Sequence, residues 1–179
     1  MAKYFLLVAA LMLMVACGGD DGSDSVDDDS QPDTESEQPD TDTTPTWVTD
    51  QTYAGLEWST LSEEMMNWQE AVDYCIAMGA RLPNINELRK IIINCPGSTY
   101  GGACQISDPD CLTMECLRED CRCDGSAESY SALGDGKGIH LWSSSFLLDV
   151  SNGAWRVSFV SGDIDPEGKD NGCLARCVR

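Results

Sequence analysis

The sequence predicts an α+β domain, in which two helices come first and antiparallel strands follow. Two helical patterns of apolar residues lie between positions 68 and 95, and strand-like alternation returns after position 139. No strand–helix unit repeats along the chain, which argues against a parallel sheet. The length of 179 residues suits one domain of ordinary size behind an N-terminal export segment.

The first 17 residues have the order of a secretory signal. Lys3 precedes an unbroken apolar run over residues 4–16, and Cys17 follows it. This run of 13 residues is shorter than the roughly 20 that a membrane-spanning helix needs. Residues 13–17 resemble a bacterial lipobox, with Met14 in place of the usual Leu. We therefore expect lipidation at Cys17; an ordinary signal peptide before a paired Cys is the alternative.

Residues 18–46 have the composition of an acidic linker. They contain 11 Asp or Glu, no Lys or Arg and three Pro, and Val26 is their one sizeable aliphatic residue. Such a segment buries too little apolar surface to offset its ordering entropy, so we expect it to be disordered. A weak cation-binding tail at residues 27–29 is the alternative to a solvated spacer. Together, residues 1–46 predict an exported protein, anchored by lipid to the bacterial cell envelope at the outer membrane or cell surface.

The charge of the chain argues against nucleic acid as a partner. The formal net charge is -20, and phosphates would repel so acidic a protein. Residues 51–179 contain 19 acidic and 10 basic side chains, a net charge of -9 (10 minus 19). The one His of the chain, His140, cannot form a metal centre of several imidazoles.

The predicted domain begins at Trp47, and its first elements are a strand and a helix. Residues 53–58 alternate loosely and predict a short strand. The next apolar residues follow helical spacing and place Cys75 on a buried face, with Gly79 ending the helix. This stripe consists of Trp68, Ala71, Val72, Cys75 and Met78.

A second helix is predicted after Pro83. Asn84 is an expected N-cap, and Glu87 stands three residues later, the spacing of a capping box. We expect Pro96 to close this helix. Its predicted buried stripe consists of Ile85, Leu88, Ile91 and Ile92.

The C-terminal third predicts strands. Residues 140–145 and 154–160 are the first two, and in the second Trp155, Val157 and Phe159 share one face. Residues 173–179 are expected to form the last strand.

Motifs spread over residues 50–179 resemble, in order, the Lcl-type C-terminal domain of bacterial proteins. The resemblance does not cover residues 94 to about 137. The matching residues are Asp50, Gly55-Leu56, Trp58, Trp68 to Ala71, Cys75, Arg81-Leu82-Pro83, Glu87-Leu88, Trp142 to Ser145, Ala154-Trp155, Val157, Phe159, Gly162 and Arg176 to Arg179.

That family is related to the C-type lectin-like fold, so the resemblance implies a lectin-like domain over residues 47–179. In that fold a Cys late in the first helix is bridged to a Cys in the final strand. The resemblance therefore implies a disulfide between Cys75 and Cys177. A free, buried Cys75 is the alternative, which an oxidising compartment disfavours.

Six further Cys lie in a polar stretch, here called the insertion (residues 95–124). Their spacing lacks the Cys-x-x-Cys pairs of a zinc ribbon, so we expect disulfides rather than zinc. With Cys17 lipidated, nine Cys are left over, an odd number. Either the six pair among themselves and Cys173 is free, or Cys173 joins them and one of the six is unpaired. The six are Cys95, Cys104, Cys111, Cys116, Cys121 and Cys123.

Calcium and catalysis have only weak signals. The Glu-Pro-Asn and Trp-Asn-Asp patterns of calcium-dependent lectins are absent. Asp163, Asp165 and Glu167 imitate the opening of an EF-hand, but its twelfth position is Leu174, so we expect a solvated turn and no cofactor, with calcium there as the weak alternative. His140 is expected to be structural, and we expect no enzyme, although converging carboxylates would permit glycoside hydrolysis.

The sequence thus predicts a binding module. We expect a surface lipoprotein whose lectin-like domain binds a glycan or a protein in adhesion, with Tyr100 and Tyr130 as candidate stacking residues. The resemblance implies adhesion to sulfated polysaccharides, which an acidic domain fits poorly. The alternative is a non-catalytic envelope scaffold that binds another envelope protein. The collagen-like stalk that supports a trimer in the best-understood members is missing, so the oligomeric state is open.

Overall fold

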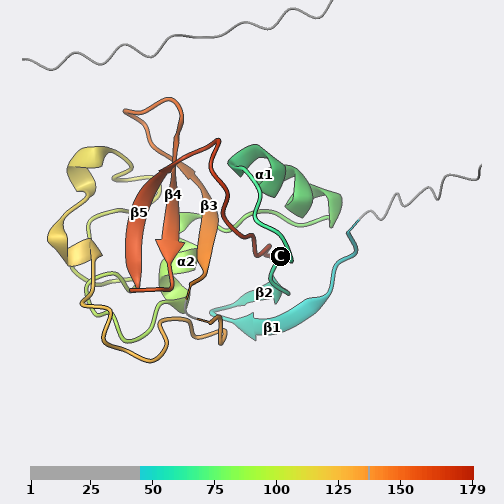
Figure 1. The fold of residues 1–179 in the computed structure, drawn as a ribbon, viewed down its shortest axis with the longest axis horizontal. Helices are drawn as coiled ribbons and strands as arrows, with labels where there is room; N and C mark the ends of the chain where they lie inside the picture. The colour runs from blue at the N-terminus through green and yellow to red at the C-terminus, as the bar shows by residue number, and fades with distance from the viewer. Residues whose placement is uncertain (1–44, 137) are drawn as a thin grey trace, which may run out of the picture. The chain divides into compact units, whose positions relative to one another are not determined.

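The structure, a computed structural model, describes residues 45–136 and 138–179 (Figure 1). The predicted signal peptide, the predicted lipidation site at Cys17 and nearly all of the predicted linker lie outside the described residues. Within the described part, no helix is long and apolar enough to cross a membrane.

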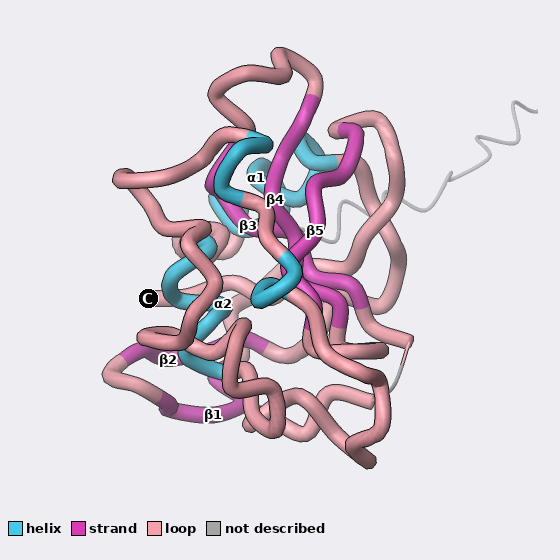
Figure 2. Tube along the Cα trace, turned by 90° about the vertical axis from the view of Figure 1, so that its left-hand side faces the viewer, coloured by secondary structure: helices cyan, strands magenta, loops and turns pink. Residues whose placement is uncertain are grey.

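The domain has the predicted α+β class, with two helices and antiparallel strands. Strands β1 and β2 form a hairpin, and the other three strands form a sheet in the order β3-β4-β5. The hairpin lies at the opposite end of the domain from the β3–β4 connection (Figure 1, Figure 2). In chain order the elements are β1 (Thr49–Tyr53), β2 (Leu56–Ser59), α1 (Trp68–Ala77), α2 (Ile85–Ile91), the 3-10 helices η1 (Met114–Cys116) and η2 (Glu119–Cys121), β3 (His140–Phe146), β4 (Gly153–Ser158) and β5 (Asp163–Gly168).

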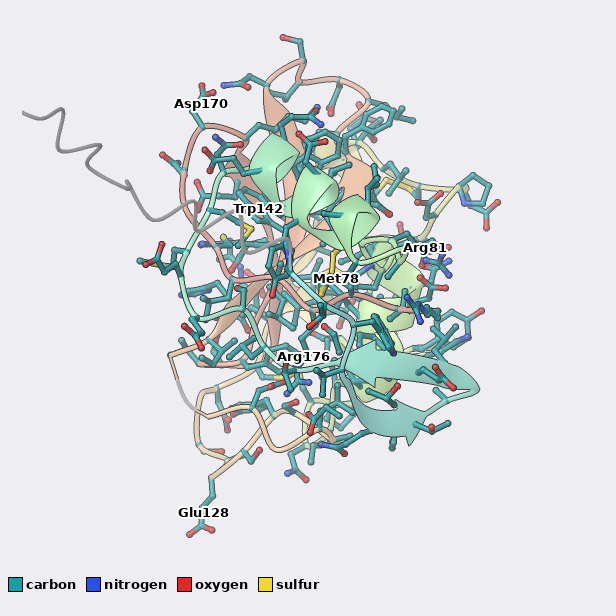
Figure 3. All side chains as sticks on the ribbon, turned by 90° about the vertical axis from the view of Figure 1, so that its right-hand side faces the viewer. Met78, Arg81, Glu128, Trp142, Asp170 and Arg176 are labelled. Carbon is teal, nitrogen blue, oxygen red and sulfur yellow. A yellow bond between two sulfur atoms is a disulfide. The ribbon has the colours of Figure 1, made fainter. Side chains whose placement is uncertain are left out.

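Helices cover both faces of the three-stranded sheet. On one face, Trp142 and Ala154 belong to a buried cluster with Ala71 and Cys75 of α1, and Figure 3 shows Trp142 beneath that helix. The other face packs on α2, which contacts β3 and β4 (Figure 1). Its buried residues are Leu141, Trp155, Val157 and Ile164 from the sheet and Ile85, Leu88 and Ile91 from α2.

Both predicted helices are present, and each begins with a capping box. In α2 the Asn84 side chain accepts from the Glu87 amide at 2.9 Å, and the Glu87 carboxylate accepts from the Asn84 amide at 2.8 Å. The prediction that Pro96 closes this helix is wrong. The helix ends at Ile91, because Ile92 is extended and forms a bridge to Ser131.

The predicted strand over residues 53–58 is confirmed in part: residues 56–58 lie in β2, whereas Tyr53 ends β1 and Ala54-Gly55 form the turn between the two strands. Ala54 and Gly55 have φ angles of 52° and 82°, which the left-handed turn between β1 and β2 requires. The strand pattern therefore belongs to two strands that pair Tyr53 with Leu56.

Two C-terminal predictions are also corrected. The expected solvated turn at residues 163–168 is strand β5, because its backbone pairs with the whole of β4 from Gly153 to Ser158. The expected last strand, residues 173–179, is an extended segment that forms only single bridges among the described residues. It runs past several elements in turn, bridging Met66, Leu141, Trp58 and Arg81 rather than one partner strand.

Arg176 joins this C-terminal segment to two other parts of the domain. Its guanidinium lies 2.8 Å from the Asp50 carboxylate and 2.7 Å from that of Asp135, and it also donates to the Ser59 carbonyl. The Arg176 side chain is 6% exposed and that of Asp135 is 1% exposed. The buried Arg176–Asp135 pair therefore fixes the C-terminal segment to the loop before β3, and the contacts of Arg176 with Asp50 and the Ser59 carbonyl fix it to the β1–β2 hairpin; Arg176 is labelled in Figure 3.

Candidate functional site

In the insertion the six Cys pair among themselves, the first of the two alternatives that the Cys count leaves, and the structure gives the partners, which the sequence does not. Three bridges join Cys95 to Cys123, Cys104 to Cys121 and Cys111 to Cys116, and Cys173 is free and buried. All six Cys of the insertion are in disulfides, so none is available as a thiolate ligand for zinc. Outside the insertion, Cys75 and Cys177 are bonded, the pair that the family resemblance implies.

More of the insertion is buried than its polar composition predicts. Ile106 and Leu112 are buried in the same cluster as the α2 face of the sheet. The Trp155 indole also donates to the Leu112 carbonyl at 3.4 Å. One side of the insertion is therefore part of the core, and its remaining surface is held in place by that core.

Arg89 anchors the first half of the insertion, a role that the sequence does not reveal. This side chain of α2 is 3% exposed and donates to four backbone carbonyls, those of Ser98, Thr99, Cys104 and Ile106. None of the described carboxylates forms an ion pair with it, and burial lowers its pKa. The carbonyl oxygens thus replace the hydration shell of the buried cation.

We expect Arg89→Met to lower the free energy of unfolding by about 3 kcal/mol, since it leaves several buried carbonyls without donors. Amide hydrogen exchange of residues 98–106 should quicken most, because these residues lose their anchor. Arg118→Met, at an exposed position of the insertion, is the control and should change neither quantity. Equal exchange in both variants would contradict the anchoring role of Arg89.

A polar hollow of about 480 Å³ opens on the outer surface of the insertion. Three exposed carboxylates line it, and Arg122 adds a positive charge. The pKa of Asp124 is lowered because the hydroxyl and amide of Ser126 donate to its carboxylate, at 2.6 and 3.0 Å. The lining residues are Asn94, Pro96, Gly97, Glu119, Asp120, Arg122, Cys123, Asp124 and Ser126.

The two tyrosines predicted to stack on a ligand have different environments. Tyr100 is 54% exposed, and the Lys90 ammonium lies 5.4 Å from its ring centroid. Tyr130 is 1% exposed, and its hydroxyl accepts from the Ala127 amide at 3.1 Å. The prediction of a stacking role for Tyr130 is wrong, because its ring packs against Gly162 inside the domain.

The three carboxylates considered for calcium lie along β5, and two of them hold neighbouring structure. Asp163 accepts from the Cys123 amide at 2.7 Å and so ties the insertion to the sheet. Glu167 pairs with Arg156 at 2.9 Å. The pKa of Asp165 is raised, first by burial and then by the nearby Asp163. Within residues 45–136 and 138–179, no group of three or more potential ligands is arranged to hold a metal ion.

His140 and Cys173 flank Arg156 on the same side of the sheet. The pKa of His140 is lowered by burial and then by the positive charge of Arg156. Burial raises the pKa of the Cys173 thiol, whose sulfur lies 3.7 Å from an Arg156 nitrogen. Because a thiolate is the reactive form of cysteine, this environment keeps Cys173 in its unreactive thiol form.

Comparison with known proteins gives one match. A family model described as the Lcl C-terminal domain matches residues 40–179, which include every described element and the whole insertion. No curated protein and no solved structure matches the chain. The match covers well over half of the 179 residues. The chain therefore belongs to the Lcl C-terminal domain family.

Proposed function

We propose that this protein is a surface-anchored lipoprotein whose lectin-like domain binds a glycan or a protein in adhesion, through the outer surface of the insertion. One observation carries the proposal: an exposed polar hollow is held in a defined shape by Cys95–Cys123, Cys104–Cys121 and Arg89. A rigid loop loses little conformational entropy when it binds, which favours recognition. The lipid anchor at Cys17 and the linker would carry this surface away from the membrane.

Two features support a relation to the C-type lectin-like fold. The Cys75–Cys177 disulfide joins the last turn of the first helix to the C-terminal segment. The longest connection of the described domain, between α2 and β3, holds the insertion. Long loops on a rigid scaffold are where proteins commonly place binding residues.

The chemistry of the hollow favours a neutral or amine-bearing glycan over a sulfated one. Asp120, Asp124 and Asn94 offer oxygens that can accept hydrogen bonds from sugar hydroxyl or ammonium groups. Sulfates would be repelled by these carboxylates and by the net charge of -9 over residues 51–179 (10 minus 19). Tyr100 follows the lining residue Gly97 by three positions, and its exposed ring is available for stacking.

A glycan array tests this proposal. It is probed with the full chain carrying Cys17→Ser, a substitution that removes the lipid anchor from the assay. We expect selective binding, and a loss of affinity of roughly tenfold in Tyr100→Ala and in Asp124→Asn, the size expected when one stacking or charge-assisted contact is removed. Tyr53→Ala and Asp73→Asn change exposed residues away from the insertion and should bind normally. A chelator should have no effect.

Two outcomes would change the interpretation. Absence of binding in a folded sample would contradict a glycan ligand and favour the second candidate, a non-catalytic envelope scaffold. That candidate has its own support, because several exposed apolar side chains lie outside the insertion, at the β3–β4 connection. Loss of binding with a chelator would establish a calcium site.

A further inference from the structure

A second surface, distinct from the polar hollow, lies where β3 turns into β4. Four large apolar side chains there are exposed: Met114 by 40%, Phe146 by 47%, Leu148 by 59% and Val150 by 43%. The β3–β4 connection projects from the end of the sheet (Figure 1). Beside it, Met114, Leu147, Val150 and the end of β5 line a hollow of about 280 Å³. We call the surface formed by these exposed side chains and the lining of this hollow the hairpin groove, after the β3–β4 connection; it is not part of the β1–β2 hairpin.

The backbone of the hairpin groove is fixed by hydrogen bonds to two neighbouring segments. The Leu148 amide donates to the Leu112 carbonyl at 3.0 Å, and the Asp149 carboxylate accepts from the Met114 amide at 2.9 Å. On the other side, the Lys169 amide donates to the Asn152 carbonyl at 3.0 Å. The apolar side chains are therefore displayed by an ordered loop, so a partner would pay little ordering entropy on binding.

The adjacent edge strand is poorly suited to pair with a partner strand. In β5, Pro166 has no amide hydrogen to donate, and the Gly168 amide already donates to the Glu167 carboxylate at 3.0 Å. Recognition at this end of β5 must therefore use side chains rather than an added strand.

The apolar part of its lining points to an apolar side chain as the occupant of this hollow, whose volume is about 280 Å³. Apolar side chains form part of its lining and suit an aliphatic or aromatic side chain: Met114, Leu147, Val150 and Pro166, beside Asn152, Gly153, Glu167 and Gly168. Exposed apolar groups grouped in this way mark interaction sites.

The charge around the hairpin groove indicates what should flank that side chain. Exposed carboxylates adjoin its lining residues: Glu115 follows Met114, Asp149 accepts from the Met114 amide, and Asp170 accepts from the Asn152 side chain. The Lys169 ammonium lies 4.5 Å from the Trp68 ring centroid and 5.2 Å from that of Phe146, so it faces aromatic rings of this domain. Cationic groups of a partner would meet a negative rim, whereas an anionic bilayer or a second copy of this acidic chain would be repelled.

We propose that the hairpin groove docks a partner polypeptide that presents an apolar side chain flanked by Lys or Arg. The apolar side chain enters the hollow between Val150 and Pro166, and the flanking cations meet the carboxylates of Glu115 and Asp170. This site is independent of the glycan proposal, since the hollow of the insertion shares no lining residue with it.

Fluorescence anisotropy with short synthetic peptides tests the proposal on the full chain carrying Cys17→Ser. The probe peptide has a Leu-Phe pair between Lys residues; one comparison peptide replaces Lys with Glu, and another replaces Leu-Phe with Ser-Ser. We expect saturable binding of the probe alone, weakened by salt. Leu148→Ser with Val150→Ser should weaken it by roughly tenfold or more, and Glu115→Gln with Asp170→Asn should reduce its salt dependence.

The controls separate this surface from general stickiness and from instability. Val160→Ser and Ile76→Ser remove apolar side chains that are 42% and 62% exposed elsewhere in the domain, and they should bind the probe normally. Unfolding curves of all variants should overlay, because the substituted side chains are exposed. Equal binding of the Glu peptide, or binding unchanged by Leu148→Ser with Val150→Ser, would overturn the proposal. So would stronger association with phosphatidylethanolamine–phosphatidylglycerol vesicles, or self-association that the same variant abolishes.

Discussion

Replacing both Cys75 and Cys177 with Ala is expected to lower the free energy of unfolding by about 5 kcal/mol, because the bridge joins residues 102 positions apart and restricts the unfolded chain. Both residues also lie in the buried cluster between α1 and the sheet, so packing is lost as well. Domains are stable by about 5–15 kcal/mol in total, so this variant should be close to unfolded. Urea unfolding followed by tryptophan fluorescence measures the change.

The Cys111–Cys116 bridge provides the matched comparison. It spans only 5 positions, so Cys111→Ala with Cys116→Ala should cost about 2 kcal/mol on the same account. Double substitutions are used in both cases so that no new thiol is left to pair with Cys173. Similar losses for the two bridges would contradict the loop-length explanation.

Arg176→Met is expected to cost about 3–5 kcal/mol, because it removes one member of a buried ion pair and leaves the other charged group buried. The Asp135 carboxylate would lose its partner at 2.7 Å while its side chain is only 1% exposed. The variant should also loosen the β1–β2 hairpin, since Arg176 binds Asp50 and the Ser59 carbonyl. Urea unfolding gives the stability, and hydrogen exchange of residues 49–59 reports on the hairpin.

Arg81→Met is the control for this experiment. The Arg81–Glu87 pair has a similar distance of 2.7 Å, but the Arg81 side chain is 53% exposed, so its loss should cost less than about 1 kcal/mol. Combining Arg176→Met with Asp135→Leu should cost less than the sum of the two single changes, because no unpaired charge is then buried. Additive costs would show that Arg176 and Asp135 do not stabilise each other.

The two helices illustrate what local sequence can predict. The spacing of Asn84 and Glu87 predicts the capping box of α2, and the stripe through Cys75 predicts the buried face of α1; both are confirmed. These features depend on residues three or four positions apart, so no distant contact is needed to produce them. The family motifs likewise indicate the domain family, which the match over residues 40–179 shows.

The errors occur where distant contacts decide the structure. Residues 163–168 have the composition of a turn, yet they form β5 because β4 offers a complete antiparallel partner. Tyr130 lies in a polar stretch, yet it is buried against Gly162. No sequence pattern indicates that Arg89 is buried, because an Arg next to Leu88 in a helix is typical of a solvated position; the carbonyls of the insertion that surround it come from distant residues.

Local patterns in the sequence predict the α+β class and both helices with their caps, but they leave open how the six insertion Cys pair and whether Cys173 joins them. The pairing, the positions of the exposed surfaces and the burial of Arg176 and Arg89 follow from the tertiary structure. The physical reason is that helix caps and apolar stripes are local. Cysteine partners, burial and the lining of a hollow depend instead on which distant segments the fold brings together.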